Sequence, residues 1–363
     1  MADGEAKALE QLRSDIDALD QELLRLINAR ARLAIEVGQV KRASGGDAVF
    51  YRPEREAVIL KRTLDSNPGP LPAAEAARLM REIMSTCLAL EHPLRVAYLG
   101  PDGTYTHLAA LKHFGGSITG VPLAGIDEVM REVESGGANY GVVPVENSIE
   151  GGVAQTLDAL RESSLKLSGE IVLTIHHQLL SRAGSLADIT HVYAHNQALA
   201  QCRRWLVSHL PHAECVPVAS NAEGARRALA DETSAAIAGE RAAEIYAIPI
   251  LHRNIEDEVG NTTRFVVVGR DSVPASGADV TSVMFTTPNR PGALHEVLSV
   301  LAEAGISMTR IESRPLREAA WDYVFFVDLE GHVDTPSVAA ALTELQRRTS
   351  RLKILGSYPR AVL

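Results

Sequence analysis

The sequence lacks several features that mark common classes of protein. Its three cysteines, Cys87, Cys202 and Cys215, form neither a C-x-x-C pair nor a spacing that suits metal ligands. This usage is typical of a reducing compartment, so the sequence predicts a cytoplasmic location. No run of 18 apolar residues is present, and the acidic start after Met1 has no apolar signal region, so we expect no membrane partner.

Positive charge is also scarce. The 363 residues carry a formal net charge of −10, which argues against nucleic acid as a main partner. The glycines form no G-x-G-x-x-G fingerprint, which disfavours a dinucleotide cofactor, and the adjacent His176 and His177 have no third ligand at a suitable spacing for a metal. With 46% hydrophobic residues, the chain is long enough for two or three domains with sizeable cores.

The first 92 residues have the pattern of one long helix and two shorter ones. Apolar residues recur at spacings of three and four from Leu9 to Val40, without proline or glycine before Gly38. The predicted helices cover residues 5–42, begin again at Pro53, and cover 73–91, with breaks at 44–46 and 68–72. Since two short helices cannot bury a stripe of this length, we expect an intertwined homodimer or a higher homo-oligomer.

Arg30 occupies a position of this apolar stripe where the spacing favours leucine. A buried charge is costly unless it is paired, so Arg30 is either half of a buried salt bridge, with Glu56 or Glu91, or part of an anion site inside the helical bundle. Lys41 lies three helical turns further along and projects from nearly the same face. Two long cationic side chains on one face favour a small dianion as the ligand.

Beyond residue 93 the pattern changes to short β-branched runs that alternate with helical segments, which is typical of an α/β domain. The predicted strands are Arg95–Leu99, Tyr140–Val145, Ile171–Ile175, His191–Ala194, Ala235–Gly239 and Phe265–Gly269. After a further break at 274–277, the order of predicted elements is βαββαβ, that of a ferredoxin-like domain. These elements are strands at 280–286, 306–311, 323–329 and 352–355 and helices at 292–304 and 337–347. A small sheet of this kind is a plausible regulatory dimerisation unit.

Two polar stretches of the α/β region lie where ligands bind. The turn at 100–107 leads from a strand into a helix, and it either offers backbone N–H groups to an anion or is a tight turn capped by Thr104. Asn147 and Ser148 follow a buried strand at its carboxyl end, where open α/β sheets bind ligands, although either residue can simply cap a helix. Thr263 and Arg264 lie at the start of another strand, where a polar pair is equally consistent with a turn and with a functional site.

Together these segments resemble the bifunctional chorismate mutase–prephenate dehydratase family with a C-terminal ACT domain, over nearly the whole chain. The segments that carry the resemblance are 12–13, 29–30, 36–41, 55–56, 100–107, 142–148, 263–265, 292–294 and 312–315. It implies an all-α intertwined mutase domain over residues 1–92, a two-lobed α/β dehydratase domain like periplasmic binding proteins over 94–272, and a ferredoxin-like ACT domain over 278–363.

The resemblance also implies a function. The chain is expected to convert chorismate into prephenate, to convert prephenate into phenylpyruvate, to need no cofactor, and to be feedback-inhibited by L-phenylalanine. Two alternatives stay open. An arogenate-preferring dehydratase is one, because the motifs do not separate a pyruvyl from an alanyl side chain. A non-catalytic, amino-acid-sensing binding protein is the other.

In the mutase domain, the resemblance assigns the carboxylate clamps to Arg30 and to Arg13 from a second subunit, since guanidinium groups suit carboxylates. Lys41 would donate to the ether oxygen of chorismate, where negative charge develops during the rearrangement. Arg55 would support the carboxylate site, and Glu56 would hold the substrate hydroxyl.

Three positions depart from the best-known mutase pattern. Arg52 replaces an acidic residue of some relatives, and Cys87 occupies a position often held by serine. Glu91 takes the place of a glutamine that hydrogen-bonds the ether oxygen. Only a protonated Glu91 can donate there, so we expect mutase activity to fall as pH rises.

In the dehydratase domain, the resemblance implies that Thr263 donates a hydrogen bond to the departing hydroxyl while Asn147 and Gln197 hold that group. Thr104 and Ser148 would bind substrate, and Arg264 would either contact a carboxylate or brace its strand. In the ACT domain, the implied phenylalanine-binding residues are Gly292, Ala293, Leu294, Glu312, Ser313, Arg314 and Pro315.

Overall fold

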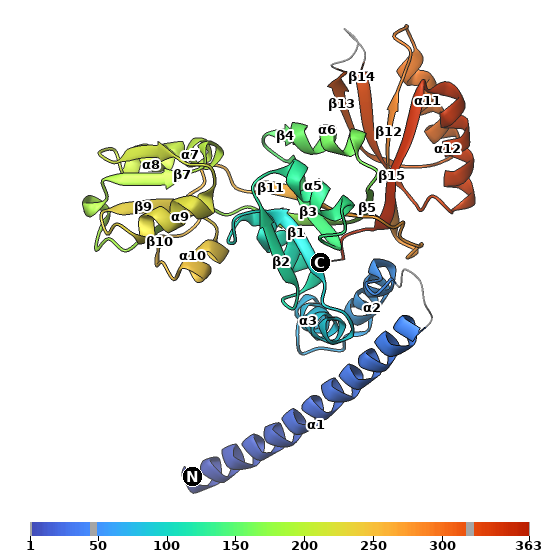
Figure 1. Ribbon diagram of the computed structural model, residues 1–363. Helices are drawn as coiled ribbons and strands as arrows, with labels where there is room; N and C mark the ends of the chain where they lie inside the picture. Colours follow the sequence, from blue (N-terminus) through green and yellow to red (C-terminus); the bar gives the residue numbers. More distant parts are fainter. Residues whose placement is uncertain (1, 44–48, 317–322, 363) are drawn as a thin grey trace.

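The computed structural model describes residues 2–43, 49–316 and 323–362 and shows three parts in series along the chain (Figure 1). The break expected at 44–46 lies outside these residues. The N-terminal part holds helices α1 (Ala2–Ala43), α2 (Pro53–Ser66) and α3 (Ala73–Glu91), which confirms the three predicted helices. No helix of the described residues is both long and apolar enough to cross a membrane.

Helix α1 extends away from the rest of the molecule as a single rod (Figure 1). Its apolar stripe is uncovered along most of its length, since Leu12, Leu19 and Val40 are 58%, 64% and 66% exposed. The C-terminal end of α1 packs against α3, where a Cβ added to Gly38 would lie 2.8 Å from Cγ of Glu91. Glycine at this position therefore lets the two helices approach closely.

An α/β region of two lobes follows, and its first lobe is built around a six-stranded sheet. The elements of lobe 1 are β1 (Arg95–Leu99), α4 (Tyr105–Phe114), β2 (Thr119–Leu123), α5 (Ile126–Glu134), β3 (Tyr140–Asn147), β4 (Gly151–Gly152), α6 (Ala154–Glu162), β5 (Lys166–Thr174) and β11 (Thr262–Gly269). The strand order is β2-β1-β3-β11-β5, with β4 paired to β3. Strand β11 runs antiparallel to both β3 and β5, so the chain returns to lobe 1 after completing lobe 2.

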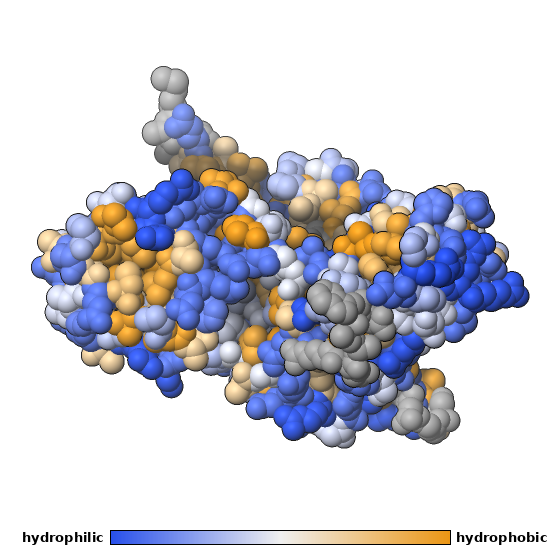
Figure 2. Space-filling model, turned by 90° about the horizontal axis from the view of Figure 1, so that it is seen from above, coloured by the Kyte–Doolittle hydropathy of each residue, from blue (hydrophilic) through white to orange (hydrophobic). Residues whose placement is uncertain are grey.

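Lobe 2 has a five-stranded sheet of order β10-β6-β9-β7-β8. Its elements are β6 (Gln178–Ser181), the short 3-10 helix η1 (Leu186–Asp188), β7 (His191–Ala194), α7 (Asn196–Gln201), α8 (Arg203–His209), β8 (Glu214–Pro217), α9 (Asn221–Leu229), β9 (Ser234–Ala238), α10 (Glu240–Tyr246) and β10 (Ile250–His252). Seen from above, a hollow separates lobe 2, on the left, from the rest of the molecule (Figure 2). All six strands predicted for the α/β region are present: β1 and β7 have the predicted ends, and the ends of β3, β5, β9 and β11 are shifted.

The C-terminal part has the predicted ferredoxin-like order. Its elements are β12 (Asp279–Thr286), α11 (Ala293–Glu303), β13 (Met308–Pro315), β14 (Tyr323–Glu330), α12 (Pro336–Arg348) and β15 (Arg351–Pro359). The antiparallel sheet has the order β13-β14-β12-β15, and α11 and α12 cover one of its faces. The other face is not open, because Met284, Phe326 and Tyr358 share a hydrophobic core with Val143 and Val266 of lobe 1.

Candidate active sites

A cleft with a volume of about 870 Å³ lies between the two lobes. Its polar lining comes from both lobes and includes Thr104, Asn147, Gln155, His177, Gln197, Gln201, Ser220, Asn221, Asn261 and Thr263. The N-termini of α4 in lobe 1 and α9 in lobe 2 open onto it, and Arg226 and Glu223 of α9 also line it. Helix N-termini carry partial positive charge, so the cleft favours an anionic ligand.

Thr263 and Asn147 are directly opposite each other on β11 and β3. Nδ2 of Asn147 donates to Oγ1 of Thr263 at 2.8 Å, and Oδ1 of Asn147 accepts from the backbone N–H groups of Ile149 and Glu150 at 3.0 and 3.1 Å. These two backbone donors determine which end of the amide faces Thr263. The hydroxyl oxygen of Thr263 therefore acts as an acceptor toward Asn147, and its own proton is available to a molecule in the cleft.

A polar chain continues from this pair across the junction of the lobes. Nδ2 of Asn147 also donates to Oδ1 of Asn261 at 2.8 Å, and Asn261 donates to Oε1 of Gln201 at 3.1 Å. His177 contacts the same Gln201 oxygen through Nε2 at 2.8 Å, and burial lowers its pKa, so the ring is neutral and donates there. Sequence reasoning missed Asn261 and Gln201, since neither belongs to a recognisable spacing, although Asn261 immediately precedes the Thr262-Thr263 pair.

The remaining residues predicted for this cleft differ in their placement. Gln197 lines the lobe 2 wall at the start of α7, opposite the Thr263 side. Thr104 lines the cleft and also caps α4, because its hydroxyl accepts from His107 N at 3.3 Å and donates to Leu99 O at 2.9 Å. The expected contact between Ser148 and substrate is not supported. Oγ of Ser148 accepts from the backbone N–H of Thr262 at 2.9 Å and joins β3 to β11 outside the cleft lining.

Arg264 does not face the cleft, so its expected contact with a substrate carboxylate is wrong and the strand-bracing alternative is right. Side chains alternate along a strand, and Thr263 and Phe265 take the cleft side of β11. The Arg264 guanidinium lies on the opposite side, where its Nε, Nη1 and Nη2 atoms donate to Glu170, Asp328 and Tyr358. Burial alone would lower the pKa of Arg264, but these partners outweigh it and raise the pKa, so the residue stays charged.

At the mutase end, Lys41 and Glu91 meet where α1 packs against α3. Nζ of Lys41 lies 2.8 Å from Oε1 of the buried Glu91 and donates to Phe50 O at 3.2 Å. Arg30 is half-buried and makes no ion pair within the described residues, so neither predicted salt bridge, with Glu56 or with Glu91, is formed. Arg13 is exposed on the free part of α1.

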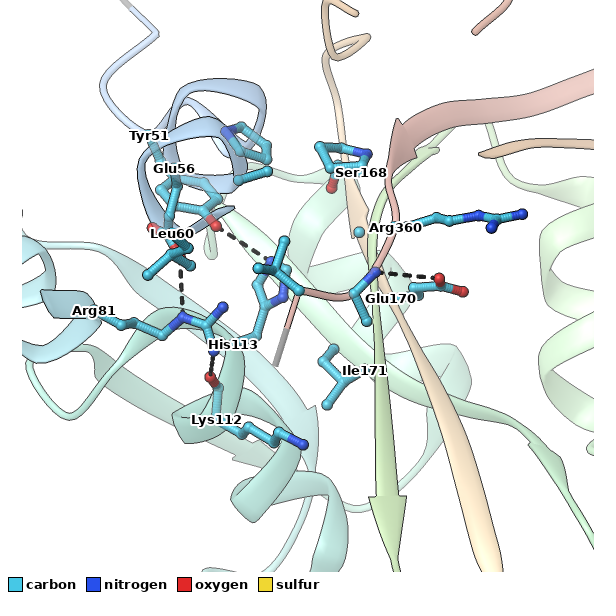
Figure 3. Close-up of a pocket in the computed structure, with 16 residues that line it drawn as sticks. Tyr51, Glu56, Leu60, Arg81, Lys112, His113, Ser168, Glu170, Ile171 and Arg360 are labelled. Atoms are coloured by element: carbon cyan, nitrogen blue, oxygen red, sulfur yellow. Dashed lines mark hydrogen bonds and ion pairs between the residues drawn. The ribbon is translucent and has the colours of Figure 1, made fainter. Parts of the chain in front are cut away.

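Glu56 lies in a different place, a small cavity where α2, α3, lobe 1 and the C-terminal segment meet (Figure 3). Its carboxylate accepts from Nε of Arg81 at 3.3 Å, and Nη1 of Arg81 donates to Lys112 O at 2.7 Å. Burial raises the pKa of Glu56 to about 7 against the opposing charge of Arg81, and burial with the same charge lowers the pKa of His113 to about 3. The single chain thus does not bring Glu56 to the Lys41–Glu91 pair.

Of two further residues predicted for the mutase site, Cys87 lies one helical turn before Glu91 on α3. Arg55 is exposed on α2, and Cys87 is buried within α3.

The expected phenylalanine-binding segments occupy two parts of the C-terminal domain. Gly292 adopts the left-handed conformation, with φ of +84°, immediately before α11, and Leu294 packs onto the core under that helix. Residues 312–315 end strand β13 beside lobe 1, where a Cβ added to Gly152 would lie 2.8 Å from Oε1 of Glu312. Arg314 lies 3.7 Å from Asp158 of α6.

Family models match the chain in three consecutive regions. They are chorismate mutase type II over residues 12–92, prephenate dehydratase over 96–273 and the ACT domain over 281–347. A bifunctional chorismate mutase/prephenate dehydratase of Stutzerimonas stutzeri is 52% identical over 363 residues, which cover 99% of this chain and 100% of the relative.

Solved structures resemble part of the chain. A prephenate dehydratase from Arthrobacter aurescens in complex with L-Phe has a TM-score of 0.68 and 37% identity, covering 74% of this chain and 90% of that one. A protein described as a novel type of quorum quenching acylase, GqqA, has a TM-score of 0.67 and 33% identity, covering 74% of this chain and 98% of that one. Three matched regions in series and a relative aligned from end to end show that the chain belongs to the bifunctional chorismate mutase/prephenate dehydratase family and is an enzyme with both activities and a C-terminal ACT domain.

Proposed function

We propose that the dehydratase reaction takes place in the cleft between the lobes, with Thr263 as hydrogen-bond donor to the departing hydroxyl of prephenate. The observation that carries this proposal is the orientation of the Thr263 hydroxyl, whose oxygen accepts from Asn147 so that its proton is free. Gln197, on the lobe 2 wall, would hold the same hydroxyl from the other side. Asn147 acts by orienting Thr263.

The chemistry demands little of the protein beyond position and charge stabilisation. Prephenate loses one carboxylate as carbon dioxide, the electron pair enters the ring, and the ring hydroxyl leaves as hydroxide, so aromatisation drives the reaction. A threonine is a weak acid, and a hydrogen bond that strengthens as charge develops on the leaving oxygen suits it better than full proton transfer. The N-termini of α4 and α9 and the guanidinium of Arg226 supply positive potential for the dianionic substrate.

The mutase reaction is proposed to take place at the α1–α3 end, in an assembly of at least two chains. Chorismate rearranges without a covalent catalyst, so the site has to hold a dianion and stabilise charge on the ether oxygen. Lys41 and Glu91 are already in contact, Arg30 lies on the same helix as Lys41, and a second copy would supply Arg13. The exposed apolar stripe of α1 is the surface that would pack against that copy.

Regulation by L-phenylalanine is proposed for the C-terminal domain, at residues 292–294 and 312–315. Two findings support it: the match to the ACT domain and the L-Phe complex of the dehydratase from Arthrobacter aurescens. The second segment lies against lobe 1, so an effector that binds there reaches a surface next to the dehydratase sheet. Inhibition requires that the effector prefer one arrangement of the lobes over another.

One assay tests all three parts. Purified enzyme receives chorismate without added cofactor, and prephenate and phenylpyruvate are followed with and without L-phenylalanine. We expect phenylpyruvate to form and L-phenylalanine to suppress it. Accumulation of prephenate alone would contradict the dehydratase assignment and call for a comparison with arogenate. Binding of L-phenylalanine without any turnover would support the amino-acid sensor instead.

A further inference from the structure

Next to the Thr263–Asn147 pair of β11 and β3 lies a second cross-strand pair, whose two members carry opposite charges. The strand register that places Thr263 opposite Asn147 also places Arg264 opposite Glu146. A β-bulge follows, because Phe265 pairs with Pro144 and leaves Val145 without a partner on β11. Thr263 and Asn147 face the cleft, whereas Arg264 and Glu146 contact the ACT domain on the other side of the sheet.

The ACT domain holds Arg264 through a buried network. Nη1 of Arg264 donates to Oδ2 of Asp328 at 2.6 Å, and Nη2 donates to the Tyr358 hydroxyl at 2.9 Å. Ser282 joins these two partners, at 2.5 Å from Oδ1 of Asp328 and 2.8 Å from the Tyr358 hydroxyl. Arg264 and Asp328 are 16% and 7% exposed, so water screens their attraction little.

Glu146 forms an ion pair with Arg310, which belongs to the same ACT sheet as Asp328. Nε of Arg310 lies 2.7 Å from Oε2 of Glu146, and the Arg310 side chain is 11% exposed. Arg310 and Asp328 are themselves partners in the register of β13 and β14. Two cross-strand pairs therefore face each other with opposite charges: Arg264 meets Asp328, and Glu146 meets Arg310.

We propose that Arg264 and Glu146 are positioning residues through which the ACT domain sets the geometry of Thr263 and Asn147. This inference rests on the proposed dehydratase site. Arg264 directly follows Thr263 in the chain, and Glu146 directly precedes Asn147, so the Cα atoms within each of these two pairs are about 3.8 Å apart. The charge-assisted hydrogen bonds of the planar Arg264 guanidinium fix direction as well as distance, so they resist small shifts of β11 against β3. The ion pair of Glu146 with Arg310 adds attraction on the β3 side. A misplacement of about 1 Å in a reacting group can cost two orders of magnitude in rate.

The test removes the ACT side of the network and leaves the cleft untouched. Asp328→Asn and Tyr358→Phe each keep the shape of the side chain but weaken the hold on Arg264. Ser357→Ala is the matched control, since it deletes the adjacent hydroxyl of β15, which bonds Thr281 at 2.8 Å and does not contact Arg264. Both network variants are expected to lower kcat for prephenate about tenfold with KM changed less than about twofold. The control variant should keep both constants.

Mutase rate and thermal melting are measured on every variant to separate misplacement from unfolding. The double variant Arg264→Gln with Asp328→Asn should lose no more kcat than Arg264→Gln alone, because both changes break one interaction. Unchanged kcat in Asp328→Asn and Tyr358→Phe, or an equal loss in Ser357→Ala, would overturn the inference. A wild-type enzyme that does not turn over prephenate would instead refute the proposed dehydratase site.

Discussion

Thr263 and Arg264 are consecutive residues with different tasks, because neighbouring side chains on β11 point to opposite faces of the sheet. The hydroxyl oxygen of Thr263 accepts a hydrogen bond from Asn147, and its proton can be donated to a molecule in the cleft. We expect Thr263→Ala to lower the dehydratase kcat by about 10²- to 10³-fold, the cost typical of losing one donor to a developing charge. The mutase rate of the same variant should stay at the wild-type value.

Thr262→Ala is the matched control for this substitution, since Thr262 is on the same strand but does not line the cleft. Thr263→Ser retains the hydroxyl and should recover most of the activity. Steady-state rates with prephenate and with chorismate give both readouts on one preparation. A parallel loss of both activities in Thr263→Ala would point to misfolding and contradict the assigned role.

Glu91 sets a second expectation at the scale of one residue. An ionised Glu91 repels the negative charge that develops on the ether oxygen. It also forms an ion pair with Lys41, whose Nζ lies 2.8 Å from Oε1 of Glu91. We therefore expect Glu91→Gln to raise the mutase kcat/KM, because the amide can donate to the ether oxygen and leaves Lys41 free to do the same. The measurement is the steady-state rate of both proteins with chorismate. An unchanged or lower kcat/KM in Glu91→Gln would show that the carboxylate does not oppose the rearrangement.

At the scale of elements, Glu56 connects α2 to α3 across the cavity of Figure 3. Its pKa is raised from 4.5 to about 7, chiefly by burial. The folded state therefore holds the Glu56 proton more tightly than the unfolded chain does. This contribution to stability is complete below pH 4.5 and is lost as pH rises through 7, with a size of the order of 3 kcal/mol.

Glu56→Gln cannot titrate, so its free energy of unfolding should decline less than that of the wild type between pH 5 and 8. Urea unfolding curves at several pH values for both proteins provide the comparison. The difference between the two proteins cancels the titration of groups they share. A constant difference across this range would mean that Glu56 titrates at the same pH in the folded and unfolded states.

The sequence predicted the elements that have a strong local pattern. The helices α1, α2 and α3 follow from unbroken apolar periodicity and proline breaks, and the βαββαβ order of the last domain follows from its alternating segments. It did not predict β2, β4, β6, β8 and β10. Of these, β2, β8 and β10 are short strands on the edges of their sheets, whereas β6 is a four-residue strand between β10 and β9. Gly120, Pro122 and Pro217 weaken the local signal in two of them, and partners distant in the sequence supply their hydrogen bonds.

The same limit applies to the site. Thr263, Asn147 and Gln197 could be selected by motif, and the structure places all three on the cleft. The sequence alone did not show on which face of the sheet the Arg264 side chain lies. The register of β11 with β3 and the contact with Asp328 of the ACT sheet determine that face. Glu56 was assigned by a motif to the mutase site, but its partner in the single chain is Arg81, from the next helix.

At the scale of the whole molecule, the C-terminal segment ties the three parts together. After β15, Val362 packs against Leu60, Ala77 and Met84 of α2 and α3. The backbone N–H of Ala361 donates to Glu170 of lobe 1 at 3.3 Å. Glu170 is also a partner of Arg264, so the segment that leaves the ACT domain meets the same network that holds β11.

The uncovered stripe of α1 leads to a prediction about assembly. Leu19→Asp places a charge in the stripe and should weaken association and lower the mutase rate, because a buried unpaired charge is costly. Gln21→Asp, about 200° around the helix from Leu19, is the matched control and should change neither. Sedimentation equilibrium and mutase assays at matched concentrations provide the readouts. Full association and full mutase rate in Leu19→Asp would contradict the proposed packing.

A complementation experiment decides whether the mutase site is shared between subunits. Arg13→Ala and Arg30→Ala should each abolish most mutase activity alone, because both guanidinium groups are proposed to clamp carboxylates. If Arg13 of one subunit serves the site that contains Arg30 of the other, a hybrid dimer retains one intact site. Random pairing after co-expression then gives about a quarter of the wild-type rate, since half of the dimers are hybrids with one working site of two. If both residues served a site within one chain, neither mutant subunit would contain an intact site, and the mixture would be as inactive as the separate variants.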